Sequence, residues 1–350
     1  MDSLTQIVLG AACGEVVLGK KIGNKALLFG AIGGTIPDLD VFIGSWIFNN
    51  EIHAMAFHRG FMHSILFSVL GAFVFGWLAL KLYNRGKRVQ TTKLKDWNWL
   101  FFWALFTHPI LDCFTPYGTQ LFAPFSDYRV AFNTISVVDP LYTVPFLMGL
   151  IVLLFFKRQS EKRRFWLKLG LGLSSGYLLF TVFNRANVNS IYEKSLKDNR
   201  ISFERFQIQP TIFNNILWYG VAENSTSYYV GFYSLLDKNP KIEDWIKIEK
   251  QHNLVPIEDE NLSKLVWFSN GYFNIQKIKA EVEKVTETEF IYHDLRYPLL
   301  NPNDPSSFIF SFRIFEKSGI WDMKNSGPRL EDDMTFSKMF SPMIERLNGK

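Results

Sequence analysis

The hydrophobic and polar positions divide the chain into two halves of different character. Up to about position 183, long apolar runs rich in Leu, Phe, Gly and Val alternate with short polar loops. Beyond Asn184 the apolar runs are short, and most of the Glu, Asn and Asp are found there. Four runs approach the roughly 20 residues that a helix needs to cross a bilayer. They cover 61–82, 97–115, 137–156 and 165–183.

Two weaker apolar runs, 4–19 and 26–44, precede these four. Both are rich in glycine, with Gly10 and Gly14 in the first and Gly30 in the second. Small residues allow the backbones of two helices to approach closely. The two runs therefore predict a tightly packed helical hairpin. With the four longer runs, they predict about five or six membrane segments.

The second half of the chain shows a different periodicity. Aromatic and polar residues alternate through 201–206 and 228–233, which is typical of strands with one buried face. Further strand candidates are 272–279, 288–296 and 307–316, and a short helix is expected over 261–268. The predicted fold class is an all-α polytopic membrane helical bundle followed by a C-terminal extramembrane α+β domain, mainly antiparallel sheet. The expected domains are 1–183 and 184–350.

The basic residues are distributed as in a membrane protein. The net charge of +5 would fit a nucleic-acid partner, but the Lys and Arg cluster in alternate loops between apolar runs. The only Lys or Arg residues in the intervening loops, 38–60 and 113–139, are Arg59 and Arg129. Because basic loops stay in the cytoplasm, we expect residues 184–350 to lie outside it. The expected partner is the lipid bilayer, and no nucleic acid is expected.

Three short polar motifs lie at the ends of apolar runs within the first 115 residues. They are Pro37-Asp38-Leu39-Asp40, His58-Arg59-Gly60-Phe61-Met62-His63-Ser64 and His108-Pro109-Ile110-Leu111-Asp112. The predicted topology brings all three to the outer face of the membrane. An Asp at the centre of a membrane helix costs roughly 2.5–3.5 kcal/mol on insertion scales. Several such groups gathered together need a partner, and a divalent metal ion is the simplest one.

The spacing within the motifs favours shared ligation. His108 and Asp112 are four residues apart, so they project from one face of a helix. Asp38 and Asp40 are two residues apart and would point the same way in an extended stretch.

In the histidine motif, Gly60 is expected in a turn, with His58 before the following helix and His63 in its first turn. Mixed imidazole and carboxylate ligands suit one or two ions of zinc, manganese or iron. Calcium and magnesium prefer oxygen ligands and fit poorly.

Other interpretations of the same residues remain open. A His–Asp pair inside a membrane can be a hydrogen-bonded pair that holds helices together. A Pro-Asp motif can end a helix, and His58-Arg59 can anchor the chain at the interface. Proton and ion pathways also use intramembrane Asp and His.

Residues around the three motifs have predicted roles of their own. Arg59 is expected to bind an anionic substrate, most naturally a phosphate, although it would equally suit a lipid headgroup. Asp40 is the other catalytic candidate. Gln6, Ser64 and Asp139 are possible supporting partners of the ligands, and a helix N-cap is an alternative for Asp139. The loop 115–126 is expected to fold over the site.

At these motifs, and at Met1-Asp2-Ser3-Leu4-Thr5-Gln6, the chain resembles the YdjM family. The resemblance implies a bacterial inner-membrane protein with metal-dependent hydrolase activity, distantly similar to zinc-dependent phospholipase C and the P1-type nucleases. It implies ligands at His58, His63, His108, Asp112 and one or both of Asp38 and Asp40. Many members have His where this chain has Gln6, which argues against a third metal ion.

The function predicted on these grounds is a membrane-embedded metal-dependent hydrolase. Its substrate would be a small-molecule or lipid phosphate ester at the outer face of the cytoplasmic membrane, attacked by a metal-activated water. Two alternatives from other classes stay open. One is a transporter that moves metal ions or protons through the same His and Asp residues, and the other is a scaffold with a structural metal.

Overall fold

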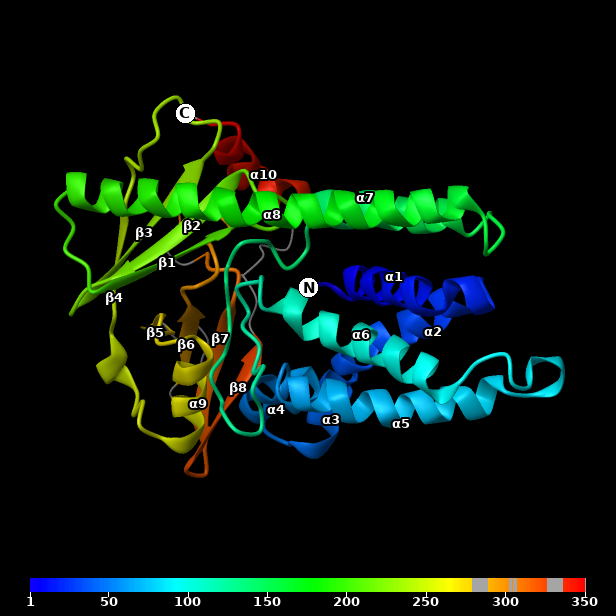
Figure 1. Ribbon diagram of the computed structural model, residues 1–350. Coiled ribbons are helices and arrows are strands. Elements are labelled where there is room, and N and C mark those ends of the chain that lie inside the picture. Colours follow the sequence, from blue (N-terminus) through cyan, green and yellow to red (C-terminus); the bar gives the residue numbers. More distant parts are fainter. Residues whose placement is uncertain (279–288, 302–303, 305–306, 326–335, 350) are drawn as a thin grey trace. The chain divides into compact units, whose positions relative to one another are not determined.

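The computed structural model describes residues 1–278, 289–301, 304, 307–325 and 336–349. The chain forms two compact units (Figure 1). We call the first the membrane unit, which comprises Met1–Ile43, Phe57–Phe183 and Ile212–Asn214. We call the second the sheet unit, which comprises Gly44–Ala56, Asn184–Thr211 and Asn215–Lys350.

Helices dominate the first 198 residues. The α-helices are α1 (Ser3–Ile22), α2 (Asn24–Thr35), α3 (Asp40–Ile47), α4 (Glu51–Phe57), α5 (Ile65–Tyr83), α6 (Leu94–Asp112), α7 (Pro140–Leu153) and α8 (Glu161–Asp198). Short 3₁₀ turns are η1 (Pro37–Leu39), η2 (Phe61–His63) and η3 (Gly86–Arg88). Several helices begin with a side-chain cap. Asp2, for example, accepts a hydrogen bond from the Thr5 amide at the start of α1.

The predicted helical hairpin is confirmed in α1 and α2. A Cβ atom at Gly10 would collide with the Gly30 carbonyl, and one at Gly14 would collide with the backbone of Ala26. Only glycine fits at these crossings, so the two helices pack backbone to backbone. Helix α2 approaches α6 in the same way, because a Cβ at Gly33 would lie 2.8 Å from that of Ala104.

Among the described residues, α5 and α8 are long and apolar enough to cross a bilayer. The bent pair formed by 24–35 and 37–47 adds a third candidate if it counts as one span. Helix α7 has 14 residues and extends about 21 Å, less than the roughly 30 Å of a hydrocarbon core. The larger number of segments expected from the sequence therefore remains a prediction.

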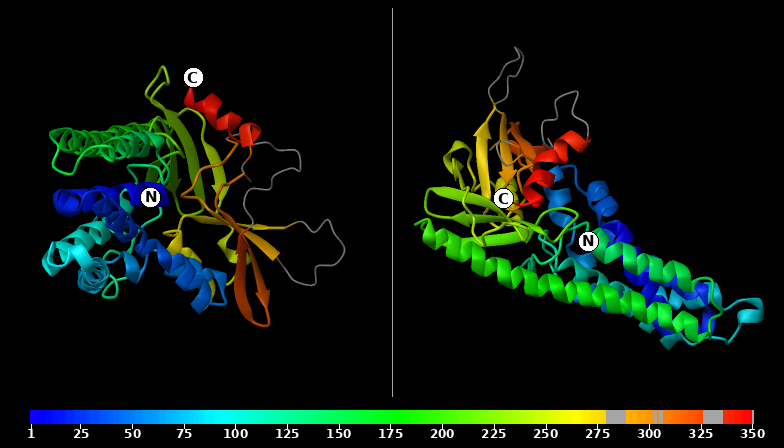
Figure 2. Two further views of the ribbon diagram at one scale, coloured as in Figure 1. Left: turned by 90° about the vertical axis from the view of Figure 1, so that its right-hand side faces the viewer. Right: turned by 90° about the horizontal axis from the view of Figure 1, so that it is seen from above.

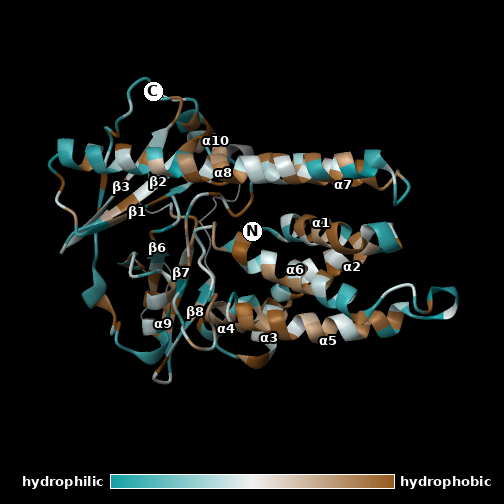
Figure 3. Cartoon of the chain, in the orientation of Figure 1, coloured by the Kyte–Doolittle hydropathy of each residue, from teal (hydrophilic) through white to brown (hydrophobic). Residues whose placement is uncertain are grey.

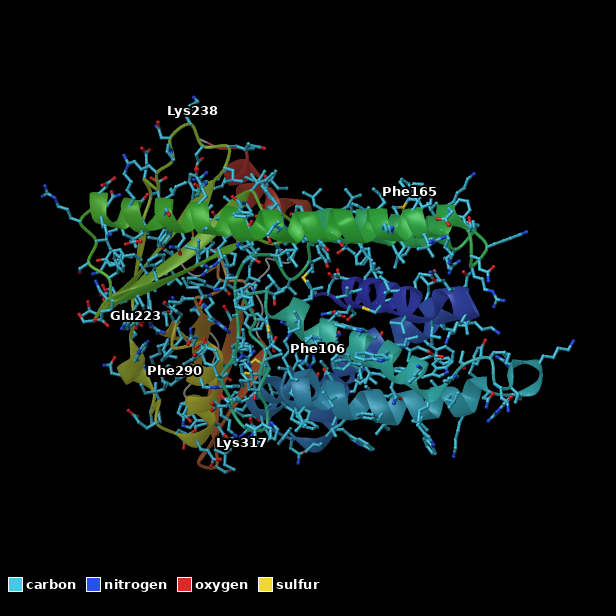
Figure 4. All side chains as sticks on the ribbon, viewed as in Figure 1. Phe106, Phe165, Glu223, Lys238, Phe290 and Lys317 are labelled. Atoms are coloured by element: carbon cyan, nitrogen blue, oxygen red, sulfur yellow. The ribbon has the colours of Figure 1, made fainter. Side chains whose placement is uncertain are left out.

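Apolar side chains on the candidate spans face outward. On α5, Phe73 is 60% exposed, and on α8, Phe165 is 59% exposed (Figure 4). Figure 3 shows apolar residues along α5 and hydrophilic residues in the loop that follows it. Lipid contact accounts for this distribution, since a water-soluble helix would bury such residues.

The sheet unit contains two antiparallel sheets of four strands each (Figure 2). The first consists of β1 (Arg205–Pro210), β2 (Leu217–Glu223), β3 (Ser227–Ser234) and β4 (Ile246–Glu249) in chain order. The second consists of β5 (Phe273–Lys277), β6 (Glu289–Asp294), β7 (Ser311–Lys317) and β8 (Ile320–Asn325). The unit also contains η4 (His252–Leu254), α9 (Glu260–Phe268) and α10 (Phe336–Leu347). Positions 279 and 288, at the edges of two predicted strands, lie outside the described residues.

These observations confirm the predicted fold class of a helical membrane region followed by a mainly antiparallel α+β region. Neighbouring strands pair in register, with Tyr219 opposite Phe232 in the first sheet and Tyr292 opposite Phe312 in the second. Leu295 and Phe308 pack with Tyr219, so one core connects the two sheets. The predicted single buried face is wrong for β3, because seven of its eight residues are buried. Residues 201–204 of the first predicted strand precede β1. The division of the chain into domains at Asn184 remains a prediction.

A segment from early in the sequence completes the core of the sheet unit. Ile52, on α4, is fully buried in the cluster formed by α9 and the second sheet. The Asn50 side chain donates to the Trp321 carbonyl, and the His53 ring contacts both Asn261 and Lys264. Residues 44–56 are thus held by apolar packing and by polar contacts at the start of α4.

The second sheet carries a buried polar row. His293 is 2% exposed, and its Nδ1 atom lies 2.7 Å from the Ser311 hydroxyl. That hydroxyl donates to the Phe308 carbonyl, so the imidazole serves as the donor to it. Burial lowers the pKa of His293 to about 4. Nearby, Asp294 and Arg296 form a buried bidentate ion pair.

We expect acid to weaken the sheet unit through His293. Between about pH 4 and 6.5 the unfolded chain binds the proton and the folded chain does not, so stability falls as the pH is lowered. The loss at pH 5 is about 2 kcal/mol relative to pH 7. Thermal unfolding of the full chain in detergent at both pH values measures it. The drop should shrink in His293→Gln, and an equal drop in both proteins would contradict the assignment.

Candidate metal centre

Four structural elements of the membrane unit carry the residues of the three motifs. Asp38 lies in η1 and Asp40 opens α3, directly after it. His63 ends η2, while His108 and Asp112 lie in the last turns of α6. The structure brings these residues together with His58. They form two overlapping groups, Asp38–His63–His108 and Asp40–His58–His63, each with the geometry to hold a metal ion.

The first group centres on two imidazoles. His63 Nε2 and His108 Nε2 lie 3.1 Å apart, and Asp38 Oδ1 lies 3.4 and 3.3 Å from them. Asp112 Oδ2 approaches the same two nitrogens at 3.5 and 3.6 Å. Zinc–ligand bonds of 2.0–2.1 Å in a tetrahedron place neighbouring ligand atoms roughly 3.3–3.4 Å apart. These five separations are close to those between neighbouring ligand atoms of a tetrahedral zinc ion.

Close helix packing fixes the orientation of His108. Its Nδ1 lies 2.6 Å from the Gly34 carbonyl, a contact made possible by the glycines where α2 meets α6. A ring nitrogen donates to a carbonyl oxygen, so Nδ1 carries the proton and Nε2 presents its lone pair. Hydrogen bonds of this kind are the usual support of metal-binding histidines.

Asp40 contacts the histidine motif through both of its carboxylate oxygens. Its Oδ1 accepts from His58 Nδ1 at 2.7 Å, and its Oδ2 accepts from the Arg59 backbone amide at 3.0 Å. His63 Nδ1 also lies 3.0 Å from Oδ2, a contact that is short but poorly aligned for a hydrogen bond. Protein donors therefore already engage both oxygens of Asp40, while Asp38 and Asp112 present oxygens to the two Nε2 atoms.

The two carboxylate oxygens of Asp112 differ in their hydrogen bonding. The Gln6 amide donates to its Oδ1 at 2.9 Å, and the α-amino group of Met1 contacts the same oxygen. Its Oδ2 atom is buried and has no hydrogen-bond partner among the described residues. A buried carboxylate oxygen without a donor is costly, and this one faces His63 and His108. Gln6 thus contacts Asp112, and its role as the partner of a metal ligand remains a prediction.

Arg59 enters the cluster through an unusual backbone conformation. Its φ angle is 61°, in the left-handed region that few side chains adopt. The guanidinium is 4% exposed, donates from Nη1 to Thr115 and places Nε 3.4 Å from Asp112 Oδ2. It also lies over the Tyr117 ring, at 4.6 Å from the centroid. Two residues of the loop after α6 thus contact Arg59.

Several sequence expectations require correction or refinement. Asp38 and Asp40 lie in a helical turn that Pro37 initiates, and not in an extended stretch. His63 ends a separate 3₁₀ turn, so it precedes the first turn of α5. Ser64 caps that helix by accepting from the Phe67 amide.

Asp139 caps α7 through the Leu141 amide, and its other oxygen accepts from Tyr177. The N-cap interpretation therefore describes Asp139. Sequence reasoning expected the loop 115–126 over the site but gave Thr115, Tyr117 and Arg129 no individual role. The only signal for them was that their loop follows a candidate ligand directly.

Comparison with known proteins places the cluster in a family. Residues 1–188 match the profile of the YdjM inner membrane protein family. The chain belongs to the YdjM family. YfhP of Bacillus subtilis strain 168, an uncharacterized protein, is 26% identical over 316 residues, which cover 85% of this chain and 87% of YfhP. No solved structure matches the chain. All residues of the cluster lie within the part that defines the YdjM family, which is a family of inner membrane proteins.

We expect Asp40→Asn to weaken metal binding by 10- to 100-fold, the usual effect of losing a carboxylate that orients a ligand. The asparagine keeps one acceptor for His58 but turns an NH₂ group toward His63 Nδ1, which favours the tautomer with its proton on Nε2. Competition of the full chain with a chelating dye for zinc measures the affinity.

Asp139→Asn is the matched control, because asparagine also caps helices and Asp139 contacts α7 and Tyr177. Its affinity should equal that of the wild type. If Asp40→Asn also binds zinc like the wild type, Asp40 does not orient His63.

Proposed function

We propose that this YdjM protein is a membrane-embedded metal-dependent hydrolase that acts on a phosphate ester at the outer face of the cytoplasmic membrane. The observation that carries the proposal is the convergence of two imidazole nitrogens and two carboxylate oxygens. The Nε2 atoms of His63 and His108 lie 3.1 Å apart, and each lies 3.3–3.6 Å from an oxygen of Asp38 and an oxygen of Asp112. Such a set needs a cation at its centre.

The tautomers explain this need. The proton of His108 is on Nδ1, opposite the Gly34 carbonyl. The Asp40 carboxylate beside His63 Nδ1 favours the proton at that nitrogen too. Two lone pairs then face each other at 3.1 Å, with Asp38 and the unpartnered oxygen of Asp112 beside them. The two lone pairs repel each other in apolar surroundings, and a cation bound between them removes this repulsion.

We assign Asp38, His63, His108 and Asp112 as the residues that hold the metal, and zinc as the metal. Two imidazoles and two carboxylates in a compact arrangement suit zinc, with manganese or iron as alternatives. When bound, such an ion lowers the pKa of a water ligand to about 7 and polarises a phosphoryl oxygen. Asp38 has the most accessible side chain of the four, at 19% exposure, so substrate and water approach from its side.

Other residues of the cluster have roles of their own in this proposal. The Arg59 guanidinium is fixed by Thr115 and Tyr117 and neutralises an anionic substrate. His58 donates from Nδ1 to Asp40, which leaves its Nε2 to take a proton from the attacking water or give one to the leaving group. His58 is 21% exposed at the side chain, unlike the buried His63 and His108. We therefore assign it to proton transfer.

The proposed location rests on charge. Basic residues gather at one end of the apolar helices, as in the loop with Lys87 and Arg88, whereas the cluster lies at the other end of α5 and α6. The positive-inside rule places the basic loops in the cytoplasm and the cluster at the opposite face. The sheet unit is then extracytoplasmic.

Purified wild-type protein should carry a divalent transition metal in stoichiometric amount, and His108→Ala should carry less than a tenth of it. His108 supplies a nitrogen ligand that alanine cannot replace. Elemental analysis of protein purified without chelators measures the content, and hydrolysis of a chromogenic phosphate ester should be lost with the metal.

His252→Asn is the matched control, since this histidine stacks on Phe273 in the sheet unit and bonds its carbonyl. It should keep the wild-type metal content. Metal-free wild type, or His108→Ala with full metal, would refute the proposed centre.

Reporter fusions test the sidedness. A phosphatase that is active only outside the cytoplasm should be active when fused after Lys350 and inactive when inserted beside Arg88. The cause is the accumulation of positive charge in the loop around Arg88. The reverse pattern would place the cluster at the cytoplasmic face and exclude an outer-face substrate.

A further inference from the structure

Two guanidinium groups converge on one aromatic ring beside the cluster. The Arg59 Cζ atom lies 4.6 Å from the centroid of Tyr117, and the Arg129 Cζ atom lies 5.0 Å from it. The His58 ring meets the same tyrosine edge-on at 5.4 Å. These residues come from separate parts of the membrane unit, and the loop after α6 supplies both Tyr117 and Arg129. The ring therefore serves as a common platform for two cations.

Both arginines are held in place by the backbone. Arg129 donates from one terminal nitrogen, Nη2, to the carbonyls of Tyr117 and Gly118. A Cβ at Gly118, whose φ is 86°, would lie 3.0 Å from the Cβ of Arg129, so a larger residue would displace the arginine. Arg59 is fixed by its left-handed backbone and by Thr115. Neither cation has to be ordered when a ligand binds.

Arg59 has one donor without a matching acceptor among the described residues. Arg59 is 4% exposed, and its buried Nε has no hydrogen-bond partner among the described residues. The nearest carboxylate, Asp112, lies 3.4 Å from that nitrogen and faces the two ligating histidines with the same oxygen. If that oxygen binds the metal, less of its charge is left for Arg59. An external oxyanion would supply the missing acceptor.

We propose that Arg59, Tyr117 and Arg129 form a binding site for a phosphate dianion, so that the substrate is a phosphate monoester and not a diester. Two fixed guanidiniums match two negative charges, whereas a diester carries only one. This inference rests on the proposed function for its substrate class, but the anion site itself does not require hydrolysis. The phosphate can belong to a lipid headgroup or to a soluble ester.

The test is calorimetric binding of inorganic phosphate to the full chain in phosphatidylcholine nanodiscs at pH 8, as purified and again after chelation. Dimethyl phosphate is the diester comparison. Wild-type protein should bind phosphate at least tenfold more tightly than dimethyl phosphate in both states. Arg129→Gln should bind phosphate at least tenfold more weakly and lose the preference. Arg129→Lys should not restore it, because a lysine lacks the planar pair of donors.

Arg88→Gln is the matched control. Arg88 lies 5.0 Å from the Tyr83 centroid, the same cation–π distance as Arg129 from Tyr117, on a loop that follows α5. It should bind phosphate like the wild type. Tyr117→Phe should also keep binding, while Tyr117→Leu should lose it, which tests the platform independently of the Arg129 variants.

A further nanodisc sample, which contains phosphatidic acid, separates the sources of the phosphate. If phosphatidic acid in the bilayer displaces soluble phosphate, the site takes a lipid headgroup. If phosphate binds unchanged beside phosphatidic acid, the ligand is soluble, and either result supports the site. Equal phosphate affinity of wild type and Arg129→Gln, or equal wild-type affinity for phosphate and dimethyl phosphate, overturns the proposal. If the protein as purified carries no metal but still binds phosphate through Arg129, the hydrolase proposal fails while the anion site stands.

Discussion

Polar groups buried among apolar helices have to be neutralised where they lie, and this constraint governs the membrane unit. His63 and His108 bring their Nε2 atoms to 3.1 Å from each other, and the surrounding structure maintains that approach. The glycine crossings of α2 bring its carbonyls within reach of α6. The left-handed backbone at Arg59 directs its amide to Asp40. The glycine crossings reduce conformational freedom on folding, and the left-handed backbone at Arg59 is strained. Both features persist only because neighbouring contacts compensate for their free-energy cost.

The sequence contained the ingredients of the site but not its local geometry. The spacing of His108 and Asp112 fixed their common helix face, because helical periodicity depends on sequence separation alone. The backbone conformation at Asp38 and Asp40 was harder to predict, since Pro37 is compatible with extended backbone and with the first turn of a helix. The roles of Tyr117 and Arg129 depend on the path of an irregular loop, which has no periodicity to predict it.

The same contrast applies to the fold. Alternating aromatic residues revealed β3, and the glycines of α1 and α2 revealed their close crossing, because both patterns reflect direct packing. The division of the chain into compact units followed no such local rule. Apolar character in α4 is compatible with lipid or with a protein core, and only tertiary contacts decide between them. Ile52 packs in a protein core.

The excursion of Gly44–Ala56 into the sheet unit determines where this chain can be cut. Asp40 and His58 flank that excursion in the sequence, and Ile52 within it needs α9 and the second sheet as packing partners. A polypeptide ending near position 188, where the family match ends, keeps every residue of the cluster but removes those partners. The stretch between Asp40 and His58 would then gain conformational entropy. Ile52 therefore ties the stretch between two residues of the cluster to the core of the sheet unit.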